Sequence, residues 1–170
     1  MPGNSDFFHG LLAVHIHVGA GAGSFYDLRG SNPVLLEPAL NDPSLRTTNF
    51  VLIHGGWPFY RETAFLLGKP NVYADFSAMN FLLSPRALSE VLRTWLEWYP
   101  EKILFATDGF AIMPELGWEE VSWLSNRTTR DALAYSLTSM LNDSLITRER
   151  ALELARMVMR DNALRLYRLK

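Results

Sequence analysis

The chain has 170 residues, 48% of them hydrophobic, which predicts a single domain over residues 1–170 with a sizeable core. It contains no cysteine, which excludes disulfides, thiolate metal sites and cysteine nucleophiles. The net charge of −2, without a basic run, argues against a nucleic-acid partner. The sequence also lacks a signal-peptide pattern and an apolar run of about 18 residues, so we expect a cytoplasmic protein that does not engage a membrane.

The first two thirds of the chain contain four short apolar runs. Each is rich in Val, Ile, Leu, Phe or Tyr, and the middle two are nearly continuous in apolar character. Such runs are typical of strands that are buried on both faces of a parallel sheet. The predicted strands are Leu11–Val18, Asn49–His54, Asn71–Phe76 and Lys102–Asp108.

Helical signals lie between and after these strands. Asn32 and Pro33 start a helix that Pro38 keeps short, and Ser84 starts a clear amphipathic helix that Pro100 ends. The alternation of strand and helix predicts an α/β fold with parallel strands joined by crossovers. Further helices are expected at Tyr60–Leu67 and, after a loop over about residues 109–128, near Thr129–Leu141, Thr147–Met159 and Arg160–Leu169.

All four predicted strands end in ionisable residues. These are His15 and His17, His54, Asp75 and Asp108. Because ligands of parallel α/β proteins bind beyond the carboxyl ends of the strands, this recurrence indicates a functional site. His15 is expected deeper in its strand, in a supporting or core position. Asp75 is expected to accept backbone hydrogen bonds in the loop after its strand.

Imidazole and carboxylate groups are good ligands for a divalent metal such as zinc. A bound metal makes hydroxide available near neutral pH, and a neighbouring carboxylate can move the proton. His17 lies nearer the carboxyl end of its strand than His15 and is the better candidate for a metal ligand. An imidazole that is not bound to the metal can polarise the substrate carbonyl.

Two rival motifs fit less well. Glycines at 19, 21 and 23 follow a strand, but their spacing is not that of a dinucleotide-binding loop. The His54-Gly-Gly segment resembles an esterase oxyanion loop, yet the sequence has no G-x-S-x-G nucleophile. Four aromatic residues in the predicted loops either line a pocket or pack on helices: Trp57, Phe59, Trp118 and Trp123.

These motifs together resemble the carboxyl-terminal half of amidohydrolase-related, metal-dependent hydrolases, a group that includes decarboxylases similar to aminocarboxymuconate-semialdehyde decarboxylase. The resemblance runs from about residue 11 to 168, through HIHVGAG, VLIHGGWPF, NVYADFSA, KILFATDG and RDNALRLY. It implies part of a (β/α)8 barrel, about strands 5–8 plus the terminal helices. His17 then matches the fifth-strand ligand, His54 the sixth-strand histidine, and Asp108 the eighth-strand aspartate, which is both metal ligand and proton shuttle. The resemblance thus implies His17, His54 and Asp108 as metal ligands, with His54 and Asp108 also catalytic. His54 either binds the metal or polarises the substrate.

The family's first strand carries an H-x-H pair, but only 37 residues separate His17 from His54, which is about one βα unit. The chain therefore corresponds to half of a barrel. Three outcomes are open: it pairs with a second copy, it pairs with a separate amino-terminal half-barrel, or it is a truncated product with little activity. The expected function is hydrolysis of an amide, ester or lactone-like bond in a small molecule, with zinc as the expected metal. The alternatives are a metal-dependent decarboxylase and a catalytically silent assembly subunit.

Overall fold

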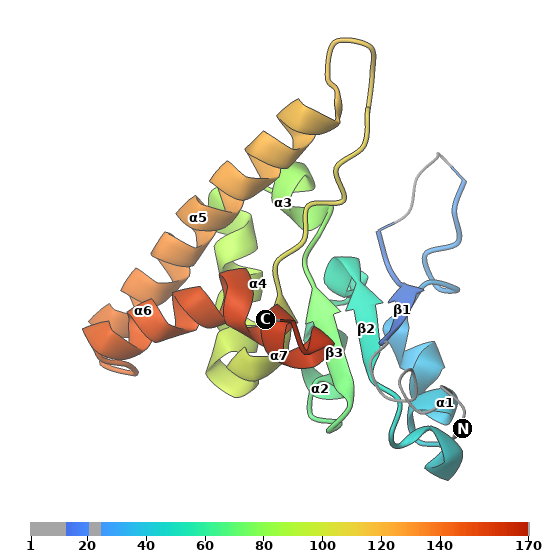
Figure 1. The fold of residues 1–170 in the computed structure, drawn as a ribbon. Coiled ribbons are helices and arrows are strands. Elements are labelled where there is room, and N and C mark those ends of the chain that lie inside the picture. Colours follow the sequence, from blue (N-terminus) through green and yellow to red (C-terminus); the bar gives the residue numbers. More distant parts are fainter. Residues whose placement is uncertain (1–12, 21–24, 170) are drawn as a thin grey trace, which may run out of the picture.

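The computed structural model describes residues 13–20 and 25–169. Strands and helices alternate along the first part of the chain, and the last third is helical (Figure 1). The strands are β1 (Val14–His17), β2 (Phe50–Ile53), β3 (Val72–Asp75) and β4 (Ile103–Leu104). The α-helices are α1 (Glu37–Leu40), α2 (Tyr60–Leu66), α3 (Met79–Leu82), α4 (Pro85–Trp98), α5 (Trp118–Asn142), α6 (Arg148–Arg156) and α7 (Asn162–Tyr167). Short 3-10 segments are η1 (Pro33–Leu36), η2 (Pro43–Leu45), η3 (His54–Gly56) and η4 (Pro100–Lys102), and η5 (Met157–Asp161) is a π-helical turn.

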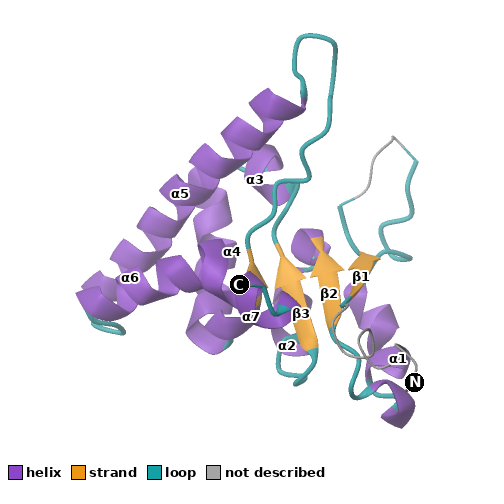
Figure 2. Cartoon of the chain, in the orientation of Figure 1, coloured by secondary structure: helices purple, strands orange, loops and turns teal. Residues whose placement is uncertain are grey.

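The strands form a single parallel sheet in the order β1-β2-β3-β4, which follows the chain. His15 pairs with Val51, Val51 with Tyr73, and Asp75 with Leu104, so these residues mark one face of the sheet. Within the described residues the sheet is open, with β1 and β4 at its edges. All four strands point toward the same rim, where long loops follow β1 and β4 (Figure 2).

The opposite face of the sheet carries the main hydrophobic core. Leu52, Ala74 and Ile103 are fully buried there and cluster with side chains from the helices. Helix α4 contributes most visibly, because Leu88, Leu92 and the neighbouring apolar positions recur at helical spacing and Ser84 caps its first turn. The face built by Leu52, Ala74 and Ile103 therefore holds the helical layer against the sheet. Other fully buried side chains in this core are Trp95, Phe76, Leu67, Met79, Leu154, Val72 and Val91.

The face marked by Val51 and Tyr73 is covered in part by the end of the chain. Leu166 of α7 is buried against Val51 and Leu104, and Tyr73 and Tyr167 pack beside them. The Tyr167 hydroxyl lies 2.8 Å from Nε2 of His15, and the two rings stack with centroids 5.9 Å apart. Helix α7 thus lies in front of the sheet while α2 and α4 lie behind it (Figure 1).

The predicted strands and most predicted helices are confirmed, with two corrections. The fourth strand ends at Leu104 instead of Asp108, because the amide of Phe105 donates to the carbonyl of Val158 in η5 and leaves the ladder. Helix α5 begins at Trp118, eleven residues before its predicted start, and the Glu120 carboxylate accepts from the amide of Gly117 at its first turn. The first predicted strand includes residues 11 and 12, which lie outside the described residues.

In the described part of the chain, we find no helix that combines the length and the apolar character needed to cross a membrane.

Candidate active site

Three ionisable residues meet at the carboxyl rim of the sheet. His17 ends β1, His54 follows β2, and Asp108 lies in the loop after β4. The His17 and His54 rings meet edge to face with centroids 4.5 Å apart, and Nε2 of His54 is 3.9 Å from Oδ2 of Asp108. The structure therefore brings the three predicted site residues to one place.

These residues line a cavity of about 390 Å³. The rest of the lining is apolar, and Phe81 and Phe110 contact each other there with ring centroids 6.2 Å apart. The cavity thus combines a few polar, ionisable groups with an apolar and aromatic lining, a composition typical of small-molecule sites. Its full lining is His17, Ala20, His54, Ala78, Phe81, Leu82, Asp108, Phe110 and Ile112.

Three of the lining residues have unusual backbone conformations. His54, Ala78 and Asp108 have φ angles of 62°, 59° and 53°, in the region that side chains other than glycine rarely adopt. At Ala78 the chain makes a γ-turn, in which the amide of Met79 donates to the carbonyl of Ser77 at 2.6 Å. Strained residues of this kind concentrate at functional sites, where the surrounding structure holds them in place.

His54 is held by the chain segment that follows β3. Its backbone amide donates to Oδ1 of Asp75 at 3.0 Å, and its Nδ1 lies 2.8 Å from the Ser77 hydroxyl. Ser77 in turn donates to Oδ1 of Asp75 through its hydroxyl at 2.5 Å and through its amide at 3.0 Å. All three residues are buried, with exposed fractions of 4% for His54, 5% for Asp75 and 1% for Ser77.

The electrostatic environment keeps His54 neutral. Burial lowers the pKa of its imidazole below the ordinary value of 6.5, and the nearby carboxylates of Asp75 and Asp108 oppose this effect only in part. The neighbouring imidazole of His17 also lowers the pKa of His54. At neutral pH His54 is therefore an uncharged base, with a lone pair available for a proton or a cation.

The donor types at this rim suit a divalent metal, but their arrangement does not form a complete site. Among residues 13–20 and 25–169, no three His, Cys, Asp or Glu side chains gather closely enough to hold a metal ion. A gap of 3.9 Å separates Nε2 of His54 from Oδ2 of Asp108. The described residues therefore fit part of a ligand set, and the assignment of His17, His54 and Asp108 as metal ligands stays a prediction.

Of the remaining expectations for the site, one agrees with the structure and others do not. Asp75 accepts backbone hydrogen bonds from His54 and Ser77, as predicted. His15 is exposed and contacts Tyr167, so it is no part of the core or of the cavity. Of the two alternatives left open for Trp57, Phe59, Trp118 and Trp123, lining this cavity does not hold for any of the four. The aromatic lining comes from Phe81 and Phe110 instead.

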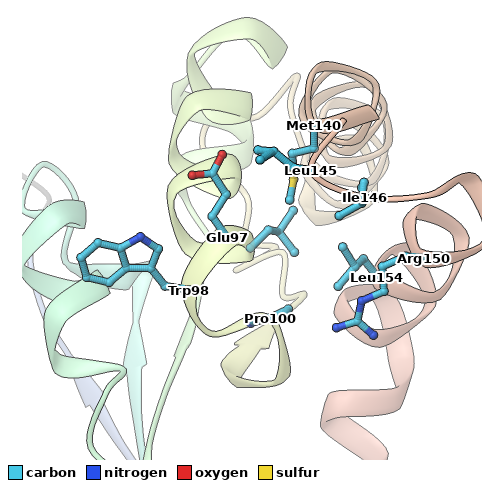
Figure 3. A pocket seen from close by; sticks show the side chains of 9 residues that line it. Glu97, Trp98, Pro100, Met140, Leu145, Ile146, Arg150 and Leu154 are labelled. Carbon is cyan, nitrogen blue, oxygen red and sulfur yellow. The ribbon is translucent and has the colours of Figure 1, made fainter. Parts of the chain in front are cut away.

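A second cavity, of about 450 Å³, lies at the opposite end of the molecule, where the end of α4 meets α5 and α6 (Figure 3). Its two charged lining residues already have partners, because Glu97 pairs with Arg93 and Arg150 with Glu153. Pro100, which lines this cavity, precedes β4 and so marks the amino end of the sheet. None of the predicted site residues reaches this cavity.

The chain is similar to several known proteins. It is 32% identical over 158 residues to Protein fluG of Emericella nidulans, a match that covers 92% of this chain and 17% of that protein. A solved structure of a proposed metal-dependent hydrolase from Lactobacillus casei ATCC 334 superposes with a TM-score of 0.78 at 24% identity, over 92% of this chain and 39% of that one. The chain thus spans well under half the length of either relative.

The structural likeness concerns the fold. The open four-stranded parallel sheet with its helices matches part of a larger chain, which agrees with the prediction of a partial (β/α) barrel. The narrower resemblance to decarboxylases stays a prediction. A family model described as Amidohydrolase matches residues 10–169, nearly the whole sequence, and the chain therefore belongs to the amidohydrolase family.

Proposed function

We propose that this chain contributes one half of the active site of a metal-dependent hydrolase that cleaves an amide, ester or lactone-like bond in a small molecule. The observation that carries the proposal is that His17, His54 and Asp108 meet in the lining of one cavity, with His54 and Asp108 3.9 Å apart. Membership of the amidohydrolase family supports the reaction class.

In this proposal His54 and Asp108 move protons. The neutral imidazole of His54 presents Nε2 to the cavity, and the carboxylate of Asp108 faces it across the gap. A water molecule or substrate hydroxyl between them can give its proton to either group, and the same group can return the proton to the leaving atom. His17 lies against the His54 ring and belongs to the same cavity lining.

A divalent metal, with zinc expected from the imidazole and carboxylate donors, supplies polarisation of water and of the substrate carbonyl when it is bound. His17 and Asp108 are the residues of this chain proposed to hold it. His54 either joins them as a ligand through Nε2 or keeps that nitrogen free to take a proton, because one lone pair cannot do both. Since the described residues form only part of a ligand set, we propose that the remaining ligands come from the half-barrel that completes the site.

The partner follows from the same reasoning. A second copy of the chain or a separate amino-terminal half-barrel is proposed to close the open sheet at β1 and β4. The apolar lining of the cavity, which includes Phe81 and Phe110, is proposed to receive an apolar part of the substrate. We propose a cytoplasmic location for the assembly.

The test is a panel of amide, ester and lactone substrates supplied to the purified chain with added Zn²⁺, with carbon dioxide measured in parallel. We expect hydrolysis that falls by about 10²–10⁴-fold in Asp108→Asn and in His54→Gln, the loss typical of a removed general acid or base. Asp131→Asn is the matched control, because Asp131 lies on α5, where it pairs with Arg127 away from the cavity.

Each other outcome has a defined meaning. Carbon dioxide release that depends on Asp108 would assign the chain to the decarboxylase alternative. Hydrolysis that is equal in the wild type and Asp108→Asn would overturn the proposed site. A chain that sediments as a self-paired assembly, shows neither reaction and retains no metal would be the silent assembly subunit.

A further inference from the structure

Asp75 and Ser77 have no part in the proposed proton transfers, yet both are buried and both bind His54. We infer that Asp75 and Ser77 are positioning residues that hold the His54 imidazole in the tautomer with its hydrogen on Nδ1, so that Nε2 faces Asp108 as a free acceptor. The chemical use of that acceptor rests on the proposed function, whereas the tautomer can be measured without any reaction.

The positions of the hydrogen atoms follow from counting donors. Ser77 has one hydroxyl hydrogen, and it donates that hydrogen to Oδ1 of Asp75 at 2.5 Å. The Ser77 oxygen can then only accept from Nδ1 of His54, which lies 2.8 Å away, so Nδ1 carries a hydrogen. A neutral imidazole has a single ring N–H, which leaves Nε2 with its lone pair.

The opposite tautomer would form no additional hydrogen bond at this rim. It would place the hydrogen on Nε2, but Oδ2 of Asp108 is 3.9 Å from that nitrogen and so beyond hydrogen-bond reach. It would also leave Nδ1 and the Ser77 oxygen facing each other without a hydrogen between them, since the Ser77 hydroxyl is engaged by Asp75.

The arrangement is also rigid, because the same Asp75 oxygen fixes the ends of two strands. It accepts the amides of His54, directly after β2, and of Ser77, two residues after β3, each at 3.0 Å. The γ-turn at Ala78 follows at once and limits the movement of Ser77. A rotation of the imidazole would therefore break a buried hydrogen bond without replacing it.

The test measures the tautomer by nitrogen-15 NMR of the full chain labelled at its histidines, at a pH above the imidazole pKa. His54→Gln identifies the His54 signals by their loss. We expect the wild type to show a protonated-type Nδ1 and an unprotonated-type Nε2 at His54. Free neutral imidazole in water favours the hydrogen on Nε2, so the expected result differs from that of an unrestrained side chain.

Two variants test the cause. Ser77→Ala should move the population toward the Nε2–H tautomer, and Ser77→Thr, which keeps the hydroxyl, should restore the wild-type pattern. Ser136→Ala is the control, because Ser136 is equally buried and donates one hydrogen bond, to Ser89, away from the cavity. Where the wild-type assay detects turnover, Ser77→Ala should lower kcat by about 10–100-fold, the loss typical of a residue that supports an active-site group.

A wild-type His54 with its hydrogen on Nε2 would overturn the inference, and that measurement needs no variant to fold. The same holds for a folded Ser77→Ala chain, verified by its backbone amide spectrum, in which the tautomer is unchanged. A chain without hydrolytic activity that keeps the expected tautomer would contradict the proposed function and leave this inference standing.

Discussion

Gly55 shows how tightly the backbone is packed beside the candidate site. Its φ of 50° is left-handed, and a Cβ built there would lie 2.1 Å from Cη2 of Trp95 and 2.9 Å from the carbonyl oxygen of Asp75. Trp95 cannot yield, because it is fully buried and its Nε1 donates to the carbonyl of Tyr60 at 2.8 Å. The glycine that follows His54 is thus required by the turn that places His54 at the rim.

We expect Gly55→Ala to lower the free energy of unfolding by about 2–5 kcal/mol, as the sum of overpacking and left-handed strain. The measurement is urea unfolding followed by circular dichroism. Gly117→Ala serves as the control: its Cβ would meet only the mobile carboxylates of Glu119 and Glu120, and it should cost about 1 kcal/mol or less. Equal losses in the two variants would contradict the packing described for Gly55.

The site residues differ in how far the sequence could predict them. His17, His54 and Asp108 directly end or follow apolar runs, so strand periodicity and the geometry of parallel sheets bring them to one rim. Ser77 bonds His54 across 23 residues of chain, and no local pattern marks that pairing. The one local feature that could have indicated Ser77 is the segment DFSA, in which a serine lies two residues after the aspartate that ends the strand.

The sequence predicts the start of a helix correctly where it contains a clear capping residue. Ser84 caps α4 through its side chain, and Pro85 begins the helix, as predicted from the sequence. The start of α5 was missed because its first turns carry Trp, Ser, Asn and Thr, which have modest helix propensity. Tertiary packing of Val121, Ser125 and Thr128 decides the conformation there, and the sequence alone does not display those contacts.

Helix α7 packs an apolar side chain against the sheet. Leu166 packs against Val51 and Leu104, whereas Leu169, three residues later, is 59% exposed. We expect Leu166→Ala to reduce the free energy of unfolding by about 2–4 kcal/mol, the cost of a truncated core leucine. Leu169→Ala should reduce the free energy of unfolding by no more than about 0.5 kcal/mol. Thermal or urea unfolding measures both, and similar values for the two would show that α7 does not cover this face.

The link between η4 and β4 contains a buried lysine that should make stability depend on pH. Lys102 donates to the carbonyl of Pro70, and its ammonium lies 4.4 Å from the centroid of the Tyr73 ring. Burial lowers the pKa of Lys102 below its ordinary value of 10.5, with Glu101 opposing the effect. The folded chain therefore binds fewer protons than the unfolded chain between the lowered pKa and 10.5, so stability rises with pH in that window.

Comparison with Lys102→Met isolates this effect, because the other titratable groups are the same in both proteins. The difference in free energy of unfolding, wild type minus variant, should increase as the pH rises through the lowered pKa toward 10.5 and stay constant below that window. Denaturant unfolding at a series of alkaline pH values gives this difference. A difference that stays flat across the series would show that Lys102 keeps its ordinary pKa in the folded protein.

At the scale of the whole molecule, the open sheet is the feature on which the proposed partner rests. Its four strands are those expected from the apolar runs, and the chain superposes on 39% of a solved relative, which agrees with part of a barrel. An open parallel edge presents unpaired backbone groups, which proteins normally cover or pair. Val14, 45% exposed on the edge strand β1, lies where an added strand would pack.

If a second copy closes the sheet, the purified chain should sediment as an assembly of at least twice its 19.3 kDa mass, and the assembly should dissociate on dilution. Val14→Lys should shift this equilibrium to the monomer, because a lysine on an edge strand opposes strand pairing. Val34→Lys is the control, since Val34 is similarly exposed, at 39%, but lies in η1, away from the sheet edge. Sedimentation that gives only 19.3 kDa at every concentration would exclude self-pairing and leave the separate half-barrel as the partner that completes the site.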